Sequence, residues 1–190
     1  MIKKPWPGMV QTLRRAMERY IDAYWIRFNR YYYTGDYARK DEDGYFWILG
    51  RADEVLKVAG HRIGTMELES NLVAHHAIAE AAVIGKKDPI KYEVPVAFVV
   101  PKENVGVNLK LREEIIKYVK TTVGPIATPS TVSFVKKLPK TRSRKIMRRL
   151  LKAIVTNQEL GDVTTLEDES SIEEVGKAYM ELKESLTKIS

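Results

Sequence analysis

The sequence contains no cysteine among its 190 residues. A chain without cysteine can form no disulfide, no cysteine-ligated zinc or iron–sulfur site, and no cysteine nucleophile. It also lacks an apolar run approaching the ~18 residues of a membrane-spanning helix. Residues 1–6 lack the apolar core of a signal peptide. Because 44% of the residues are hydrophobic, which is enough for a core, we expect a folded, soluble cytoplasmic protein with no membrane partner.

The net charge of +7 is unevenly distributed along the chain. Residues 136–152 hold nine basic residues and no acidic one, whereas residues 153–190 hold nine acidic and three basic residues. A basic segment of this kind is typical of a stand-alone nucleic-acid-binding module. Nucleotide phosphates and coenzyme A are also polyanions that the same field would attract, so both classes of ligand stay open.

Aromatic residues are concentrated near the N-terminus, where residues 1–47 contain twelve of the seventeen. Large aromatic side chains need burial or an interface, and so short a segment can scarcely bury twelve of them. The pattern favours an exposed apolar surface at the edge of a larger structure. A compact aromatic core is the alternative.

Hydrophobic periodicity gives the expected secondary structure. Helices are predicted over residues 10–28, 66–73, 111–123, 144–155 and 171–186. Strands are predicted over residues 31–37, 45–49, 79–85, 94–101 and 132–135, with a turn at 41–44 that makes the first two a hairpin. On the second helix, Glu67 and Glu69 are expected to point outward. The alternation of strands and helices indicates an α+β or α/β sandwich.

Two motifs in the first third of the chain suit a nucleotide. Thr34-Gly35-Asp36 places a carboxylate on a turn, where it can accept hydrogen bonds from the two hydroxyls of a ribose. An aspartate that caps the turn is the alternative. Residues 50–64 contain three glycines and two arginines, which permit close backbone approach and donate to phosphate oxygens. An ordinary charged linker would have the same composition.

A third motif spans residues 138–149, where a basic loop runs into the start of a predicted helix. Side-chain charge then adds to the helix dipole, and both favour an anion. Lys145 at this junction could neutralise a carboxylate or a developing phosphate charge. A solvated basic helix face is the alternative.

The order and spacing of these motifs resemble the C-terminal portion of AMP-forming acetyl-coenzyme A synthetases, which belong to the adenylate-forming superfamily. The resemblance covers nearly the whole chain. It is carried by residues 6–8, 33–36, 43–45, 50–51, 60–65, 124–129, 138–149 and 160–162. Residues 124–129 and 139–149 are similar to acetyl- or propionyl-CoA synthetases rather than to the superfamily at large.

The resemblance implies an α+β fold, the small C-terminal domain of the adenylate-forming enzymes, with a short three-stranded sheet flanked by helices. It implies a fragment of the large domain over residues 1–52, a hinge at 53–54, the small domain over 55–153 and an acidic tail over 154–190. The family uses ATP, Mg²⁺ and coenzyme A to convert acetate to acetyl-AMP and then to acetyl-CoA. The small domain swings about the hinge between the two half-reactions.

Site residues follow from the matched positions. By resemblance, Asp36 would bind ribose, and Arg51 and Arg62 would contact the nucleotide of ATP or AMP. Asp53 falls at the hinge. Lys145 matches the lysine that orients the carboxylate and phosphate during adenylation, which in the family is also a target of regulatory acetylation.

Further positions match the family's coenzyme and cation sites. Coenzyme A would be approached by Ala59, Gly60 and Lys120. A cation site built from backbone carbonyls and one histidine would comprise Val73, His75 and Ile78. Arg144 stands where the family has glycine, Ala59 where it has serine, and Lys120 where it has arginine.

We therefore expect the C-terminal part of an acetate–CoA ligase that is inactive on its own, because the phosphate loop and the acyl pocket of the large domain are absent from this sequence. A separately encoded large domain is a possible partner. A nucleic-acid-binding module is the alternative from another class, and a non-catalytic remnant that docks onto the large domain is a third.

Overall fold

The computed structural model describes residues 1–29 and 31–187. The chain divides into two compact units, of which the first is Met1–Asp53 and the second begins at Glu54. None of the described helices is long and apolar enough to cross a membrane.

The first unit contains one helix, α1 (Met17–Tyr24), and an aromatic cluster. Tyr20 of α1 and Tyr32 are buried, and the Tyr32 ring stacks on that of Tyr24 with centroids 5.0 Å apart. The helix is shorter than the predicted 10–28. Arg15 has a left-handed backbone with φ of 56°, and Ala16 supplies no side-chain cap, so the helix cannot extend toward residue 10.

A hairpin of β1 (Asp36–Lys40) and β2 (Phe46–Arg51) completes the first unit. Its first strand starts later than the predicted 31–37, and Tyr32 before it belongs to the cluster beside α1. Asp41 closes the turn by accepting from the backbone N–H of Tyr45 at 2.8 Å and from the Trp47 indole at 2.7 Å. The indole hydrogen bond is the main cause that lowers the pKa of Asp41.

The hairpin carries four consecutive exposed apolar residues. The exposed fractions lie between 56% and 71% for Tyr45, Phe46, Trp47 and Ile48. A two-stranded sheet has no partner layer of its own to cover either face. The expected exposed apolar surface is therefore present in the first unit.

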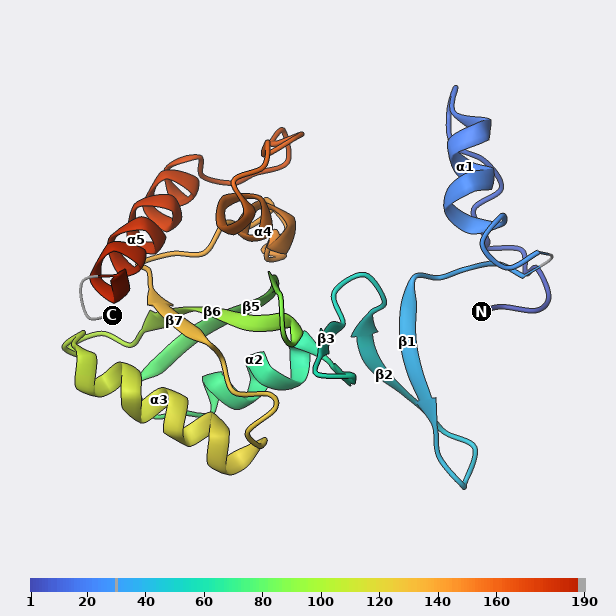
Figure 1. Cartoon of the computed structure of the whole chain (residues 1–190). Helices are drawn as coiled ribbons and strands as arrows, with labels where there is room; N and C mark the ends of the chain where they lie inside the picture. The colour runs from blue at the N-terminus through green and yellow to red at the C-terminus, as the bar shows by residue number, and fades with distance from the viewer. Residues whose placement is uncertain (30, 188–190) are drawn as a thin grey trace. The chain divides into compact units, whose positions relative to one another are not determined.

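The second unit is built around a sheet with β6 at its centre (Figure 1). The strands are β3 (Leu56–Val58), β4 (His61–Ile63), β5 (Ile78–Asp88), β6 (Tyr92–Pro101) and β7 (Thr131–Phe134). β5 pairs antiparallel with β6, and β7 pairs parallel with it. The strands predicted over residues 79–85, 94–101 and 132–135 are thus confirmed. The β3–β4 hairpin, in a segment where the sequence predicted no strand, joins the sheet through the pairing of Val58 with Tyr92.

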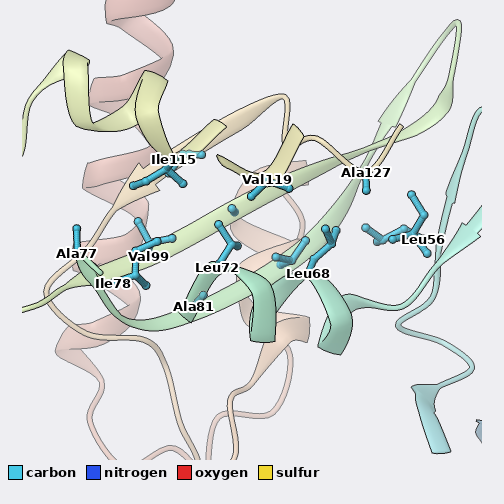
Figure 2. Packing of buried hydrophobic residues seen from close by; sticks show 14 of the residues in the cluster. Leu56, Leu68, Leu72, Ala77, Ile78, Ala81, Val99, Ile115, Val119 and Ala127 are labelled. Atoms are coloured by element: carbon cyan, nitrogen blue, oxygen red, sulfur yellow. The ribbon is translucent and has the colours of Figure 1, made fainter. Parts of the chain in front are cut away.

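Helices cover both faces of this sheet. α2 (Thr65–Val73) and α3 (Leu109–Thr122) lie on one face, and α4 (Arg148–Thr156) and α5 (Ser170–Thr187) on the other (Figure 1). Figure 2 shows the first face, where Leu68 and Leu72 of α2 meet Ile115 and Val119 of α3 over Val99. Because both faces are buried, β5 and β6 are apolar along most of their length. The predicted α+β class, with a sheet flanked by helices, is confirmed.

The segment predicted as an acidic tail, residues 154–190, contributes apolar residues of α5 to a core cluster of the second unit. The apolar stripe along α5 consists of Val175, Tyr179 and Leu182, at spacings of four and three residues. Val175 is fully buried, and the Tyr179 ring lies 6.0 Å from that of Phe98 on β6. Glu173, Glu174, Glu181 and Glu184 lie close to these apolar residues in the sequence, and the composition of the segment therefore concealed its packing.

Candidate active site

The end of the first unit's hairpin brings together three predicted site residues. Asp36 and Arg51 are register partners on β1 and β2. The Arg51 guanidinium lies 3.6 Å from the Asp36 carboxylate and 3.3 Å from that of Asp53, and it donates to the carbonyl of Thr34 at 3.1 Å. A carboxylate that accepts from hydroxyls thus sits beside a guanidinium that donates to phosphate or ribose oxygens.

Gly35 makes this arrangement possible. Its φ is +80°, a left-handed conformation that disfavours other residues. A Cβ at this position would lie 2.7 Å from Nη1 of Arg51, closer than real contacts allow. The glycine therefore lets the guanidinium lie across the turn.

The β3–β4 turn holds the two predicted coenzyme residues Ala59 and Gly60. Both have positive φ, 47° and 84°, which is the geometry of a tight type I′ hairpin turn. The Ala59 N–H donates to the Lys91 carbonyl at 2.9 Å, which fixes the turn to the sheet. Apart from its chain neighbours, none of the described residues has an atom within 4 Å of where a Cβ on Gly60 would be, so its backbone is open to approach by a ligand.

A pocket of about 290 Å³ lies beyond this turn. Its lining residues are His61, Arg62, Ile63, Glu67 and the segment 123–127. The fold thereby brings predicted nucleotide residue Arg62 to the 124–129 motif, more than 60 positions away in the sequence. Lys120, in the last turn of α3, is exposed and is not one of the described residues that line the pocket.

Lys145 projects from a turn that backbone hydrogen bonds hold closed. The Thr141 N–H donates to the Lys145 carbonyl at 2.9 Å, and the Arg144 N–H donates to the Thr141 carbonyl at 2.8 Å. The Lys145 N–H in turn donates to the Thr141 hydroxyl at 3.1 Å. The Lys145 side chain is exposed, and its ammonium has no ion pair within residues 1–29 and 31–187.

Arg144 adopts the backbone that glycine favours. Its φ is +67°, and its side chain extends toward Glu167 at 3.6 Å. This left-handed residue ends the turn and prevents a helix from starting there. The helix predicted from residue 144 therefore begins at Arg148 instead.

Part of the basic run is paired with carboxylates. Lys137 pairs with Asp168 and Arg144 with Glu167, both in the acidic segment, and Lys140 pairs with Glu80 at 2.6 Å. Arg149 donates to the carbonyls of Leu160 and Asp162. These contacts offset part of the positive field on which the nucleic-acid alternative depended, and that alternative has no support.

A buried charge network that the sequence did not predict surrounds Arg148, which follows the turn that bears Lys145. The Arg148 guanidinium donates to both carboxylate oxygens of Glu69, at 2.8 and 2.6 Å, and to Glu54 at 3.1 Å. Glu69, predicted to point outward, is only 8% exposed. Its hydrogen bonds to Arg148 raise the pKa of that guanidinium despite burial. In the sequence, the adjacent charges of Asp53 and Glu54 were the signal that could have indicated this network.

The predicted cation residues lie between the end of α2 and the start of β5. Val73 is exposed, whereas His75 and Ile78 are buried. Nδ1 of His75 accepts from the Ala77 N–H at 3.3 Å, so Nε2 carries the proton and faces Glu114 at 3.4 Å. Burial is the main cause that lowers the pKa of His75.

His75, His76 and Glu114 also place three ligand atoms within 4.8 Å of one another. Both ring nitrogens of His75 already have partners, as in a structural histidine. Mg²⁺ prefers oxygen ligands, so the imidazole is a poor match for it and backbone carbonyls would have to supply the remainder.

The chain is similar to known proteins over almost its whole length. Residues 67–145 match the family model described as the AMP-binding enzyme C-terminal domain. The acetyl-coenzyme A synthetase of Pyrobaculum aerophilum is 60% identical over 99% of this chain. Over nearly its whole length, the chain is similar to acetyl-coenzyme A synthetases. Its match is to the C-terminal portion of these enzymes, as the resemblance predicted.

Two further relatives and two solved structures extend the comparison. An acetyl-coenzyme A synthetase of Chlorobaculum tepidum is 52% identical over 91% of the chain, and the 3-hydroxypropionyl-coenzyme A synthetase of Metallosphaera sedula is 50% identical over 89%. An ATP-bound RpMatB–BxBclM chimera matches 82% of the chain and 30% of its own, with a TM-score of 0.70 and 27% identity. An acyl-CoA synthetase of Brucella canis matches 68% and 24%, with a TM-score of 0.54 and 42% identity.

The chain spans between 25% and 28% of the length of these curated relatives. The relatives contain much that this sequence does not.

Proposed function

We propose that the chain is the C-terminal part of an acetate–CoA ligase. The ligase joins acetate to the α-phosphate of ATP, which releases pyrophosphate, and then transfers the acetyl group from acetyl-AMP to the thiol of coenzyme A, which releases AMP. The observation that carries this proposal is the Lys145 ammonium. It stands on a fixed turn without an ion-pair partner among the described residues, in a chain 60% identical to an acetyl-coenzyme A synthetase.

The nucleotide would be held by the end of the first unit's hairpin. The Asp36 carboxylate accepts from the two ribose hydroxyls, and Arg51 donates to neighbouring ribose or phosphate oxygens. Their 3.6 Å separation allows one ligand to contact both. Arg62 of β4 would also contact the nucleotide, as the resemblance implies.

Lys145 would act in the adenylation step. Its ammonium lies between the acetate carboxylate and the α-phosphate, so that it lessens their repulsion and stabilises the charge that develops as they join. A cation already paired with a protein carboxylate would have to break that pair first. The exposed, unpaired ammonium of Lys145 avoids this cost.

The second half-reaction would use a different face of the second unit. We propose that rotation about Asp53 removes Lys145 and brings in the turn of Ala59 and Gly60, whose open backbone lets the slender pantetheine arm of coenzyme A pass. Lys120 would pair with a phosphate of the coenzyme as a point charge.

Mg²⁺ would enter with ATP and offset the charge of its phosphates. The predicted cation position at Val73, His75 and Ile78 remains a proposal, with the carbonyl oxygens as its ligands. A cytoplasmic location likewise stays a prediction.

The large domain is the proposed partner of the exposed hairpin. Four consecutive apolar residues from Tyr45 to Ile48 are more than half exposed, and burial of such a patch favours association. In a complete ligase the large domain would cover this surface, whether it comes from the same chain or from a separate one.

Two assays on the 190-residue chain test the proposal. Acetate-dependent exchange of pyrophosphate into ATP should be absent, because the chain alone lacks the phosphate loop and acyl pocket. AMP should nevertheless shift the NMR resonances of Gly35 and Arg51, and Asp36→Asn should abolish these shifts. Asp43→Asn, an exposed carboxylate on the same hairpin, is the matched control. Clear exchange by the isolated chain, or AMP shifts that ignore Asp36, would contradict the proposal.

A further inference from the structure

Two adjacent carboxylates mark the boundary between the units, and each faces a different arginine. Asp53, the last residue of the first unit, lies 3.3 Å from Arg51 of that unit. Glu54, the first residue of the second unit, lies 3.1 Å from Arg148 of that unit. Along the chain, the partner of Arg51 is therefore followed directly by the partner of Arg148.

The two contacts differ in strength. The Arg51–Asp53 pair is exposed, with 51% and 73% of the side chains accessible. An exposed pair of this kind biases an equilibrium by no more than about fivefold. Arg148 and Glu54 are only 19% and 27% exposed. Water screens their contact far less, so it opens far less often.

Arg148 is itself held from behind by a buried carboxylate. It forms a two-pronged hydrogen bond with Glu69 of α2, whose Oε1 also accepts from the Val83 N–H of β5 at 2.8 Å. Loss of the cation would strand the Glu69 charge, which shifts an equilibrium by about a hundredfold or more. The Arg148 guanidinium thus connects Glu54 to Glu69 of α2 and, through Glu69, to β5.

The same residue begins the helix that follows the lysine turn. Arg148 is the first residue of α4, where a cation opposes the helix dipole, so helix stability does not explain its presence. The Met147 N–H donates to the Pro139 carbonyl at 2.8 Å, which fixes the base of the turn that bears Lys145. Arg148 therefore connects Glu54 to the base of the turn that bears Lys145.

We propose that Arg148 is a positioning residue that fixes Glu54 to the second unit, so that movement between the units is confined to Asp53. Lys145 then turns with the unit as one body, and the weak Arg51–Asp53 contact is the one that yields. This inference rests on the proposed movement of the second unit about the hinge.

The absence of cysteine allows a direct test in the 190-residue chain. Lys40→Cys and Lys152→Cys, both exposed, place one spin label on each unit, and the width of the inter-label distance distribution measures their relative movement. Backbone ¹⁵N order parameters locate the pivot. In the unaltered sequence, values below about 0.6 are expected at Asp53 but not at Glu54 or Val55.

Glu54→Ala should extend the low order parameters to residues 54 and 55 and broaden the distance distribution. Arg148→Lys, which keeps a cation for Glu69 but loses the fork, should do the same. Lys137→Gln removes an exposed pair with Asp168 in the same unit and should change neither measurement. A purely structural role would lower the melting temperature of the second unit without moving either readout.

Two results would overturn the inference. If folded Glu54→Ala and Arg148→Lys variants keep the original order parameters and distribution width, Arg148 does not set the pivot. If the unaltered chain already gives a single narrow distribution and a rigid Asp53, the domain movement itself is refuted, whatever Arg148 does.

Discussion

Removal of the Arg148 guanidinium should destabilise the second unit by about 3 kcal/mol. Arg148→Met leaves the Glu69 carboxylate buried, 8% exposed, without its cation, and breaking a buried pair costs about 3–5 kcal/mol. The lower end applies because 19% of the Arg148 side chain is accessible. In a Glu69→Gln background no charge is stranded, and the amide oxygen can still accept from the Val83 N–H. The same Arg148→Met change should then cost only about 1 kcal/mol.

The double-mutant cycle isolates this coupling, which should be about 2 kcal/mol. Urea unfolding at pH 7, followed by far-UV circular dichroism, reports the second unit through its four helices. Tryptophan fluorescence follows the first unit as an internal control, because all three tryptophans lie before residue 54. Additive effects of the two substitutions would refute the argument that the buried carboxylate depends on Arg148.

Three smaller predictions follow from contacts elsewhere. The Lys137 ammonium is the main cause that lowers the pKa of Asp168 to about 2. The stabilisation from the Asp168 carboxylate is therefore present above the ordinary pKa of 3.8 and is lost as pH falls toward 2. Asp168→Asn should flatten acid unfolding, monitored by circular dichroism, in that window. Gly35→Ala forces a left-handed alanine against Arg51, and we expect a loss of about 1–2 kcal/mol in the first unit by fluorescence-monitored urea unfolding, together with weaker AMP shifts. Phe46→Ser should reduce self-association in sedimentation velocity, and unchanged association would show that the exposed hairpin is not responsible.

The sequence predicted the class of fold because most elements of the second unit have strong local patterns. β5 and β6 are nearly continuous apolar runs, and α3 shows a clear helical stripe through Ile115 and Val119. A basic loop before an apolar helical pattern was also visible in one dimension, but the turn that bears Lys145 was not, because the helix was predicted to start at residue 144. Boundaries were less predictable: the left-handed backbone of Arg144 moves the start of α4.

Long-range contacts were beyond the sequence. Glu69 looks like a surface residue of α2, and only the approach of Arg148, 79 positions later, makes its burial tolerable. The acidic composition of α5 likewise hid an apolar stripe that packs on the sheet. The family resemblance located the candidate site residues, but the partners that hold them in place emerged only from the fold.

The central claim is that this chain supplies the adenylation lysine and the coenzyme-binding face of an acetate–CoA ligase. A chimera in which this chain replaces the corresponding portion of the Pyrobaculum aerophilum enzyme tests it most directly. We predict acetate-dependent pyrophosphate exchange by the chimera. Lys145→Ala should reduce that exchange by about a hundredfold or more, while acetyl transfer from supplied acetyl-AMP to coenzyme A stays within a fewfold. A folded chimera without exchange, or equal loss of both half-reactions in Lys145→Ala, would contradict the account.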